Sequence, residues 1–350
     1  MKKKHLLLIG LALLSFACNQ GGEKDNSTAD KGAIVSTALT EKNACLLSEI
    51  SYCKDISLAL GKYLPGWISV WEASELEGNF AFVVTNGREY ALVIRGSLID
   101  FSWSAFQNWI YQDLHVGKQD RWEFTIDSSH AKIARGAFNG WQNLSKMTDK
   151  KTGQLLLPFL ENELKDDSHL LITGHSLGGN LATVYASYLW QQFSKIRRSV
   201  TNINVITFAA PAAGNEAFAI DFNKKFPSSI RVENANDIVP KFPNPSGISS
   251  LGNLYCDSLH AKKIMVGYKD LTISLSTVFT LLSASMNLLE FTNGISTYEQ
   301  TNGNGKIVRI PLSGQHNGTD IMNWLGEAGY QHGIANYAAF EGVTVVECGK

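Results

Sequence analysis

The chain has 350 residues, of which 44% are hydrophobic, 10% aromatic and 18% charged. Its 31 Lys and Arg residues balance 32 Asp and Glu residues, which gives a formal net charge of −1. This balance argues against a nucleic-acid partner, because nucleic-acid binders usually carry a basic excess. The aromatic content argues against a wholly disordered chain, and 30 Gly and 8 Pro exclude collagen-like or Pro-rich fibres. The composition predicts a globular protein with a large core.

The first 17 residues have the pattern of a bacterial secretory signal. Three lysines follow Met1, and His5 to Phe16 form an apolar run that is too short to cross a bilayer as a helix. The run ends in Ser-Phe-Ala before Cys18, which is similar to the lipobox of bacterial lipoproteins, where the Cys becomes the lipidated N-terminus. We predict an exported lipoprotein that Cys18 anchors to a bacterial membrane, on its periplasmic or cell-surface side. Plain secretion after cleavage near Ala17 is the alternative.

The remaining chain divides into a polar segment and one folded domain. We predict a signal peptide over residues 1–17, a lipidated flexible tether over 18–40, and a single domain over 41–350 with an insertion near 250–312. The four cysteines of the domain can pair in three ways or remain free thiols; they are Cys45, Cys53, Cys256 and Cys348. The sequence has no Cys-x-x-Cys and no His-x-x-x-His, so it gives no support for a metal site.

Predicted helices and strands alternate along the chain. The patterns indicate helices over 44–64, 154–165 and 177–195, a hairpin over 79–95 that turns at Asn86-Gly87, and strands over 169–173, 204–209, 229–233 and, as a further candidate, 263–268. Strands that alternate with helices predict an α/β fold with a mostly parallel central sheet flanked by helices.

The chain changes character after residue 250. Residues 271–289 carry no charge, and they predict an apolar helix or a cap over a site. Their many Ser and Thr residues disfavour a membrane span. Residues 297–310, with Asn and Gly in the middle, predict a second hairpin.

The strongest chemical signal is Gly174-His-Ser176-Leu-Gly178, which fits the Gly-x-Ser-x-Gly nucleophile elbow. An apolar strand precedes it and an Ala- and Leu-rich helix follows it, as an elbow requires. The two Gly residues allow the strand and the helix to pass closely, and the start of the helix supplies N–H groups and a positive dipole end. We therefore predict Ser176 as a nucleophile; the alternative is an ordinary helix N-cap.

A serine nucleophile needs a base and an orienting acid, and in this fold the acid lies between the two in the chain. Asp237 fits the acid, because it follows the predicted strand 229–233 in the loop that leads to Pro240. Asp221 and Asp257 compete with it, but neither follows so clear a strand. The alternative role for Asp237 is that of a turn or cap residue.

The base is a histidine that follows the acid in the chain. The sequence offers His260, His316 and His332. We favour His332, which lies at a predicted loop-to-helix junction; a lone histidine is otherwise more often a hydrogen-bonded bystander. The oxyanion of the transition state needs two N–H donors, for which we predict Leu177, directly after the nucleophile, and Ser97, after the strand that ends near Arg95.

These motifs together resemble the class 3 lipases, the family of the fungal triacylglycerol lipases. The resemblance covers residues 80–340 in the family's order. It rests on five segments, namely Arg95-Gly96-Ser97, Asn108-Trp109-Ile110 with Asp113-Leu114, Gly174 to Gly179, Asp237 to Pro243, and His332 with Tyr337.

The resemblance implies an α/β-hydrolase fold and hydrolysis of carboxylic esters through an acyl-enzyme, without a cofactor. It assigns attack to Ser176, proton transfer to His332, orientation of the base to Asp237, and the oxyanion hole to Ser97 and Leu177. In the family, the segment after the oxyanion loop forms a lid over the acyl cleft. Here that segment contains Phe101, Trp103 and Phe106, for which core packing is the alternative.

The expected partners are a lipid or other ester substrate and a membrane reached through the N-terminal anchor, with no nucleic acid. Acylglycerols are the first substrate class that the resemblance implies. A phospholipid and an acylated polysaccharide, cleaved by a feruloyl or acetyl esterase, are alternatives within the same chemistry. A surface lipoprotein that binds lipid or glycan without turnover is the alternative from another class, and the intact set of Ser176, Asp237 and His332 argues against it.

Overall fold

A seven-stranded sheet lies at the centre of the structure. The computed structural model describes residues 39–97, 116–127, 130–196, 202–268, 271–301 and 304–348, all within the unit Ala38–Lys350. The strand order is β1-β2-β3-β6-β7-β9-β13. The pairs β1–β2 and β2–β3 are antiparallel, and every pair from β3 onward is parallel. The strands are β1 Ile68–Glu72, β2 Ala81–Thr85, β3 Glu89–Ile94, β6 His169–His175, β7 Ile203–Phe208, β9 Ile230–Asn234 and β13 Asn304–Val308.

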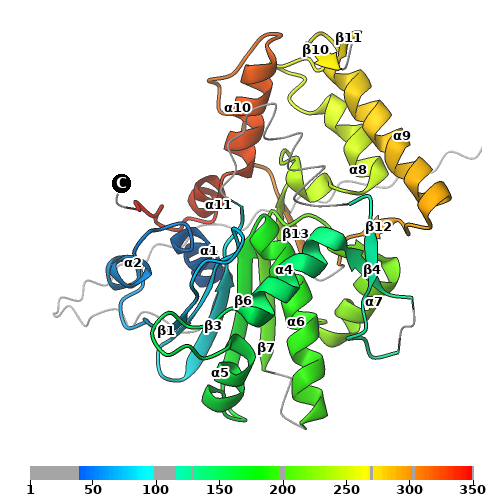
Figure 1. Ribbon diagram of the computed structural model, residues 1–350. Coiled ribbons are helices and arrows are strands. Elements are labelled where there is room, and N and C mark those ends of the chain that lie inside the picture. Colours follow the sequence, from blue (N-terminus) through cyan, green and yellow to red (C-terminus); the bar gives the residue numbers. More distant parts are fainter. Residues whose placement is uncertain are drawn as a thin grey trace, which may run out of the picture. The chain divides into compact units, whose positions relative to one another are not determined.

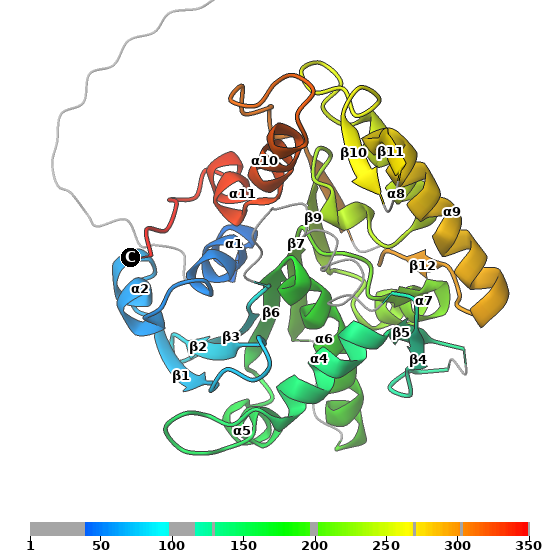
Figure 2. The same ribbon diagram turned by 45° about the horizontal axis from the view of Figure 1, so that its top comes forward.

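Helices cover both faces of this sheet (Figures 1 and 2). Alternate residues of β3 show why both faces are apolar: Ala91 and Val93 belong to one buried cluster, and Leu92 and Ile94 to another. The first cluster includes residues of α1 Glu41–Ile50, α2 Ile56–Tyr63 and α11 Ile334–Phe340. The second includes residues of α4 Arg135–Lys146, α5 Leu156–Glu163, α6 Leu177–Lys195 and α7 Glu216–Lys225. The predicted α/β architecture is confirmed.

A third apolar cluster joins residues of α4, α6 and α7 to helices that lie beyond one end of the central strands, where Figure 1 shows them. In this cluster the rings of Phe279 and Trp324 pack together, with their centroids 5.3 Å apart. This cluster draws on α8 Pro245–Ser250, α9 Leu275–Asn293, α10 Ile321–His332, the 3-10 helices η2 Val239–Lys241 and η3 Leu251–Asn253, and the hairpin of β10 Met265–Tyr268 with β11 Leu271–Ser274. A small sheet in the order β12-β8-β5-β4 adjoins it, formed by β12 Tyr298–Glu299, β8 Gly214–Asn215, β5 Lys132–Ala134 and β4 Gln119–Arg121.

The elements nearest the elbow agree with the sequence. The β2–β3 hairpin turns at Asn86-Gly87, where Gly87 has a φ of +94° and the Asn86 side chain accepts the N–H groups of Arg88 and Glu89. β6, α6, β7 and β9 begin and end within two residues of the predicted bounds. α5 begins only at Leu156, so Pro158 lies in its first turn, where a helix needs no N–H donor.

Two predicted elements have different pairings or bounds. The single helix expected over 44–64 is wrong, because α1 ends at Ile50 and α2 begins at Ile56. Asp55 separates them by accepting the N–H of Leu58 as the N-cap of α2. The strand expected over 263–268 is present as β10, but it pairs with β11 and does not join the central sheet.

The hairpin expected over 297–310 is also wrong. Its first half, β12, pairs with β8, and its second half, β13, pairs in parallel with β9. Both halves thus find partners far away in the sequence. Since β13 pairs with β9, the segment expected as an insertion near 250–312 includes an edge strand of the central sheet.

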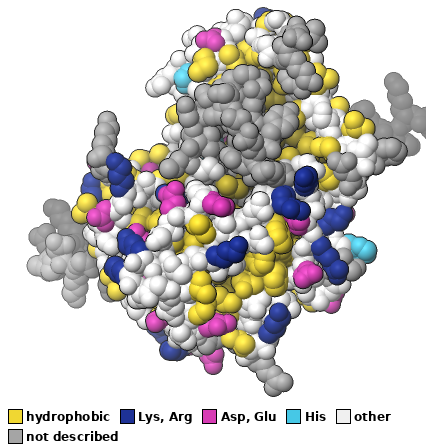
Figure 3. Space-filling model, in the orientation of Figure 1, with side chains coloured by type: hydrophobic (Ala, Val, Ile, Leu, Met, Phe, Trp, Pro, Cys, Tyr) yellow, Lys and Arg dark blue, Asp and Glu magenta, His cyan; other side chains and the backbone are white. Residues whose placement is uncertain are grey.

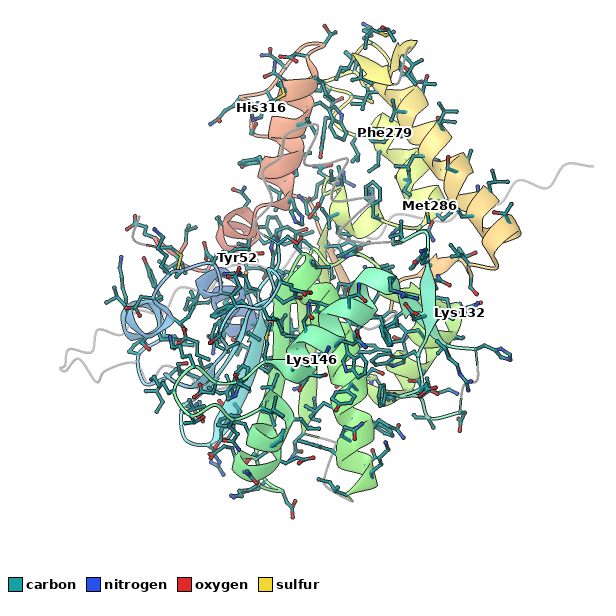
Figure 4. The ribbon with its side chains drawn as sticks, viewed as in Figure 1. Tyr52, Lys132, Lys146, Phe279, Met286 and His316 are labelled. Atoms are coloured by element: carbon teal, nitrogen blue, oxygen red, sulfur yellow. A yellow bond between two sulfur atoms is a disulfide. The ribbon has the colours of Figure 1, made fainter. Side chains whose placement is uncertain are left out.

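The uncharged segment 271–289 forms β11 and most of α9. Ser274 caps α9 by accepting the N–H of Thr277. Phe279 and Met286 are buried against the third cluster (Figure 4), while Leu281 and Leu288 are exposed. Among the described residues, no helix combines the length and apolar character that a membrane crossing needs.

One disulfide joins distant parts of this unit. Cys53 and Cys348 are bonded across a sequence separation of 295. Cys45 is a buried free thiol and Cys256 an exposed one. The break between α1 and α2 places Cys53 outside both helices, where its side chain reaches the C-terminal segment.

Charges of both signs are interspersed on the face that α4, α5 and α6 share. In the lower half of the view in Figure 3, Lys and Arg side chains alternate with Asp and Glu side chains, with no block of one sign.

Candidate active site

Ser176 lies at a sharp turn between β6 and α6. Its backbone has φ 59° and ψ −130°, a conformation that non-glycine residues rarely adopt. Such a conformation costs on the order of 1–3 kcal/mol and persists only where neighbouring contacts hold it. Here the Ser176 N–H donates to the carbonyl of Phe208, and its carbonyl accepts the N–H groups of Gly179 and Asn180. The turn lifts the hydroxyl out of the strand, above the start of α6.

The two glycines of the motif allow this turn. A Cβ on Gly174 would lie 2.5 Å from the carbonyl of Gly178, and one on Gly178 would lie 2.2 Å from the carbonyl oxygen of Ile94. Neither space can hold a carbon atom. The end of β3, the end of β6 and the first turn of α6 are therefore in backbone contact.

His332, the last residue of α10, contacts the Ser176 hydroxyl. The distance from His332 Nε2 to Ser176 Oγ is 2.9 Å. On the other side of the ring, Nδ1 lies 2.9 Å and 3.1 Å from the two carboxylate oxygens of Asp237. A carboxylate only accepts, so Nδ1 carries the hydrogen. Nε2 is then unprotonated in the neutral ring and can accept the serine proton.

Asp237 is fully buried, and further donors support its charge. The N–H of Val239 donates to Oδ1 at 2.9 Å, and the hydroxyl of Tyr337 donates to Oδ2 at 2.8 Å. Burial, and next the negative charge of Asp237, raise the pKa of Tyr337 well above its usual value, so its hydroxyl stays a donor. A buried carboxylate with three donors is well suited to hold an imidazole in one tautomer.

Asn234, at the end of β9, joins the acid to the base. Its N–H donates to the Tyr337 oxygen at 2.9 Å, and its side-chain amide donates to the carbonyl of Gln331 at 3.0 Å. Its side-chain oxygen accepts the N–H of Ile310 at 3.1 Å. The residue before His332 is thereby fixed to the strand that precedes Asp237. Neither Asn234 nor Gln331 belongs to a motif that indicates a particular chemistry, so the sequence alone carries no signal for them.

Two more residues lie behind the elbow. His175 Nε2 is 2.8 Å from the carbonyl oxygen of His332, and its Nδ1 is 2.8 Å from the hydroxyl of Tyr52. Burial, and next the neighbouring His332, lower the pKa of His175 well below 6.5, so this ring is neutral. His175 occupies a variable position of the elbow pattern, and Tyr52 lies outside every motif, so this pair could not be found from the sequence alone.

Ser97 and Leu177 lie on opposite sides of Ser176 in the chain, yet both line one cavity of about 400 Å³. Gly96 lines it too, and a Cβ on Gly96 would come within 3.2 Å of Ser176 Cβ. The loop of Ser97 is thus in contact with the elbow. Leu177 is the first residue of α6, whose first N–H groups have no carbonyl acceptor within the helix.

The competing sequence candidates lie elsewhere. Asp221 pairs with Lys225 at 2.7 Å within α7, buried on both sides. The ring of His316 packs against Gly326 of α10 (Figure 4), and Asp257 and His260 are exposed. The structure therefore brings together Ser176, Asp237 and His332.

Some predicted residues cannot be placed. Cys18 and the lid candidates Phe101, Trp103 and Phe106 lie outside the described residues. Within the described ranges, no three His, Cys, Asp or Glu side chains gather closely enough to hold a metal ion.

Comparison with known proteins gives a family and a set of relatives. Residues 80–247 match the family model "Lipase (class 3)". A lipase of Caenorhabditis elegans, ZK262.3, is 32% identical over 117 residues, which is 31% of this chain and 32% of that protein. The secreted mono- and diacylglycerol lipase 1 of Fusarium solani is 36% identical over 73 residues, 21% of this chain and 20% of that protein. The chloroplastic phospholipase A(1) DAD1 of Arabidopsis thaliana is 29% identical over 105 residues, 30% of this chain and 22% of that protein.

The chain thus spans a third or less of the length of these curated relatives. Among solved structures, that of M37 lipase matches with a TM-score of 0.67 at 22% identity, over 87% of this chain and 93% of that one. The likeness to M37 lipase supports the fold that the strand order already indicates.

Proposed function

We propose that this chain is a serine carboxylic-ester hydrolase of the class 3 lipase type, which cleaves acylglycerols through an acyl-enzyme; the family match over residues 80–247 supports this proposal. The observation that carries the proposal is the continuous hydrogen-bonded line Ser176–His332–Asp237, with 2.9 Å at each of its two links. In this line a buried carboxylate orients an imidazole whose Nε2 faces a strained serine.

The chemistry follows from this order of groups. Ser176 Oγ attacks the ester carbonyl carbon while its proton moves to His332 Nε2, and Asp237 stabilises the imidazolium that forms. The backbone N–H groups of Ser97 and Leu177 hold the negative oxygen of the tetrahedral intermediate. The bond to the alcohol then breaks, and the alcohol leaves with the proton from His332. Water, deprotonated by His332, next attacks the acyl-enzyme and releases the acid and Ser176.

Acylglycerols are the proposed substrate class because the lipase relatives include one named for mono- and diacylglycerols. A phospholipid is the second candidate, which the phospholipase A(1) relative favours. Both substrates present the same ester carbonyl to Ser176 and differ only in the alcohol that leaves. The hydrogen-bonded line of Ser176, His332 and Asp237 supports an enzyme that turns over its substrate. It argues against the alternative of a lipid- or glycan-binding protein without activity.

We also propose the location predicted from the N-terminus, with Cys18 as the lipidated residue after removal of residues 1–17, a tether to residue 40 and one domain from residue 41. The Cys53–Cys348 disulfide supports export, because such bonds persist in oxidising compartments. The relative from Fusarium solani, named as secreted, supports export as well. Labelling with a radioactive fatty acid tests the anchor: the wild type should take up the label and Cys18→Ala should not.

Hydrolysis of a series of p-nitrophenyl esters, from acetyl to palmitoyl, tests the activity. The protein that begins after Cys18 is compared with its Ser176→Ala variant. We expect a rate that rises with chain length and is lost in the variant. A preference for acetyl would move the substrate to small or polysaccharide esters, and a rate that survives in Ser176→Ala would overturn the mechanism. Mixed emulsions of diacylglycerol and phospholipid then decide between the two lipid classes.

A further inference from the structure

A chain of hydrogen bonds runs behind the elbow from Tyr52 to the main chain of His332. Tyr52 lies just after α1, close to α11, as Figure 4 shows. Its hydroxyl is 2.8 Å from His175 Nδ1, and His175 Nε2 is 2.8 Å from the carbonyl oxygen of His332. The rings of His175 and His332 are stacked at a tilt, with centroids 4.6 Å apart. Tyr52 is thus two hydrogen bonds from the residue that contacts Ser176.

The protons in this chain have one arrangement. A carbonyl oxygen only accepts, so His175 Nε2 carries the hydrogen toward His332. The buried ring is neutral, since its pKa is well below 6.5, and Nδ1 therefore has a free lone pair. Burial raises the pKa of Tyr52, so its hydroxyl keeps its proton and donates to Nδ1. Each group donates in the same direction, from Tyr52 through His175 to His332.

Tyr52 also contacts the loop that leads to Ser97. A Cβ added to Gly96 would lie 2.5 Å from the Tyr52 hydroxyl oxygen and 2.6 Å from the carbonyl oxygen of His175. The hydroxyl thus fills the space that a side chain at position 96 would need. One hydroxyl is in contact with the oxyanion loop and with the residue before the nucleophile, and it reaches the base through His175.

We propose that Tyr52 is a positioning residue for this site, because its hydroxyl fixes the ring of His175, which in turn fixes the main chain of His332, and packs the Gly96 loop against the elbow. The inference rests on the proposed esterase function and adds to it a residue outside the family match, which begins at residue 80. Phenylalanine would fill the same volume but would leave His175 Nδ1 buried without a donor.

The position of Tyr52 is itself fixed from two sides. Its neighbour Ser51 donates a hydrogen bond to the carbonyl of Ser48 at the end of α1, and its other neighbour, Cys53, is bonded to Cys348. α1 packs on the same sheet face as α11, which follows His332 directly. The hydroxyl therefore comes from a segment whose residues on both sides of Tyr52 are anchored.

The test is Tyr52→Phe, with Tyr63→Phe as the matched control. Tyr63 lies in the same segment and its hydroxyl accepts the N–H of Glu347 at 2.9 Å, a bond with no link to Ser176. We expect Tyr52→Phe to lower kcat about tenfold with KM changed less than twofold, since one lost hydrogen bond of about 1.4 kcal/mol is a factor of ten. Tyr63→Phe should keep the wild-type kcat. Equal losses in both variants would overturn the proposal, because the effect would then follow from general loosening.

A double-mutant cycle checks the route through His175. If Tyr52 acts through His175, Tyr52→Phe should cost nothing further in a His175→Phe background. Losses that multiply would show that the route is wrong. If His175→Phe does not fold, His175→Gln takes its place, because glutamine retains one donor and one acceptor. In that background the Tyr52 effect should persist, since the amide oxygen can accept the hydroxyl proton; an effect that disappears there would contradict the proposal.

The rate of Ser176 labelling by a small fluorophosphonate separates this inference from the proposed function. Labelling measures activation of the serine and needs no correct ester. If the wild type reacts with the fluorophosphonate but hydrolyses none of the esters, only the proposed function is contradicted. In that case a labelling rate about tenfold slower in Tyr52→Phe still supports the positioning role.

If Tyr52→Phe reacts at the wild-type rate, the inference is overturned, whatever the esters show. If the wild type does not react with the fluorophosphonate, both the proposed function and the inference are overturned.

Discussion

The close packing at Gly178 makes a single methyl group a sharp test of the site. In Gly178→Ala, the new Cβ would lie 2.2 Å from the Ile94 carbonyl oxygen and 2.7 Å from the Gly96 nitrogen. Ordinary van der Waals contact begins at 3.4 Å, so the end of β3 or the first turn of α6 must move by about 1.2 Å. Both segments carry groups that the mechanism needs, namely the Gly96-Ser97 loop on one side and Leu177 on the other.

The expected rate loss follows from this displacement. A misplacement of about 1 Å at a reacting centre costs on the order of 10²-fold, so kcat for a soluble ester should fall about 100-fold. Stability is a weaker readout, because overpacking costs about 1–3 kcal/mol while alanine gains about 1 kcal/mol over glycine in a helix. The net change in the free energy of unfolding is therefore only about 0–2 kcal/mol.

Gly61→Ala is the control, because Gly61 also lies in a helix but a Cβ there meets nothing within 4 Å. It should keep the wild-type kcat and raise stability by about 0.5–1 kcal/mol. Steady-state kinetics and urea denaturation of both variants measure the difference. A Gly178→Ala variant with wild-type turnover would refute the reasoning, since the strand and the helix would then have space that the structure does not show.

Three further predictions follow from contacts around the site and the core. Asp237→Asn should lower kcat about 10⁴-fold, because the amide donates to His332 Nδ1 and so places a protonated Nε2 toward Ser176. Steady-state rates measure this loss, and a loss under tenfold would contradict the prediction. The Cys53→Ser, Cys348→Ser double variant should lose about 2–5 kcal/mol of unfolding free energy in urea under oxidising conditions. Its free energy of unfolding should then equal that of the reduced wild type. An unchanged urea midpoint would show that the bond contributes nothing to stability. Burial raises the pKa of Glu49 to about 7, so the folded state binds more protons than the unfolded state above pH 4.5, and stability falls as pH rises toward 7. Glu49→Gln removes this penalty, so in urea titrations its stability relative to the wild type should be greater at pH 8 than at pH 5. If the difference in stability between variant and wild type is the same at pH 5 and at pH 8, burial of the Glu49 carboxylate is not its cause.

The sequence predicted those elements whose partners are local or whose residue types are restrictive. The elbow is the clearest case, because Gly174 and Gly178 are required by contacts of 2.5 Å and 2.2 Å that no other residue permits. The β2–β3 hairpin is another, since Asn86-Gly87 determines its turn. Asp237 and His332 could be ranked above their competitors from chain order and from position after a strand or before a helix.

The sequence could not predict pairings that depend on distant strands. The Asn and Gly residues in the middle of 297–310 favoured a hairpin, yet β13 pairs with β9, some seventy residues upstream. In the same way, nothing near Tyr52 indicates that its hydroxyl contacts His175, 123 residues away. The apolar period of 44–64 continues across the break at Asp55, because the residues of α1 and α2 are buried in the same cluster.

The disulfide turns most of the described unit into a covalent ring. Cys53 and Cys348 enclose Ser176, Asp237 and His332, so a single proteolytic cut in any loop between the two cysteines opens the ring and leaves one molecule. Both fragments would stay tethered, and the serine and its base could not diffuse apart even when the cut lies between them. The same bond requires that Cys348 be synthesised before the ring can close, so its oxidation reports that all three residues are already in the chain.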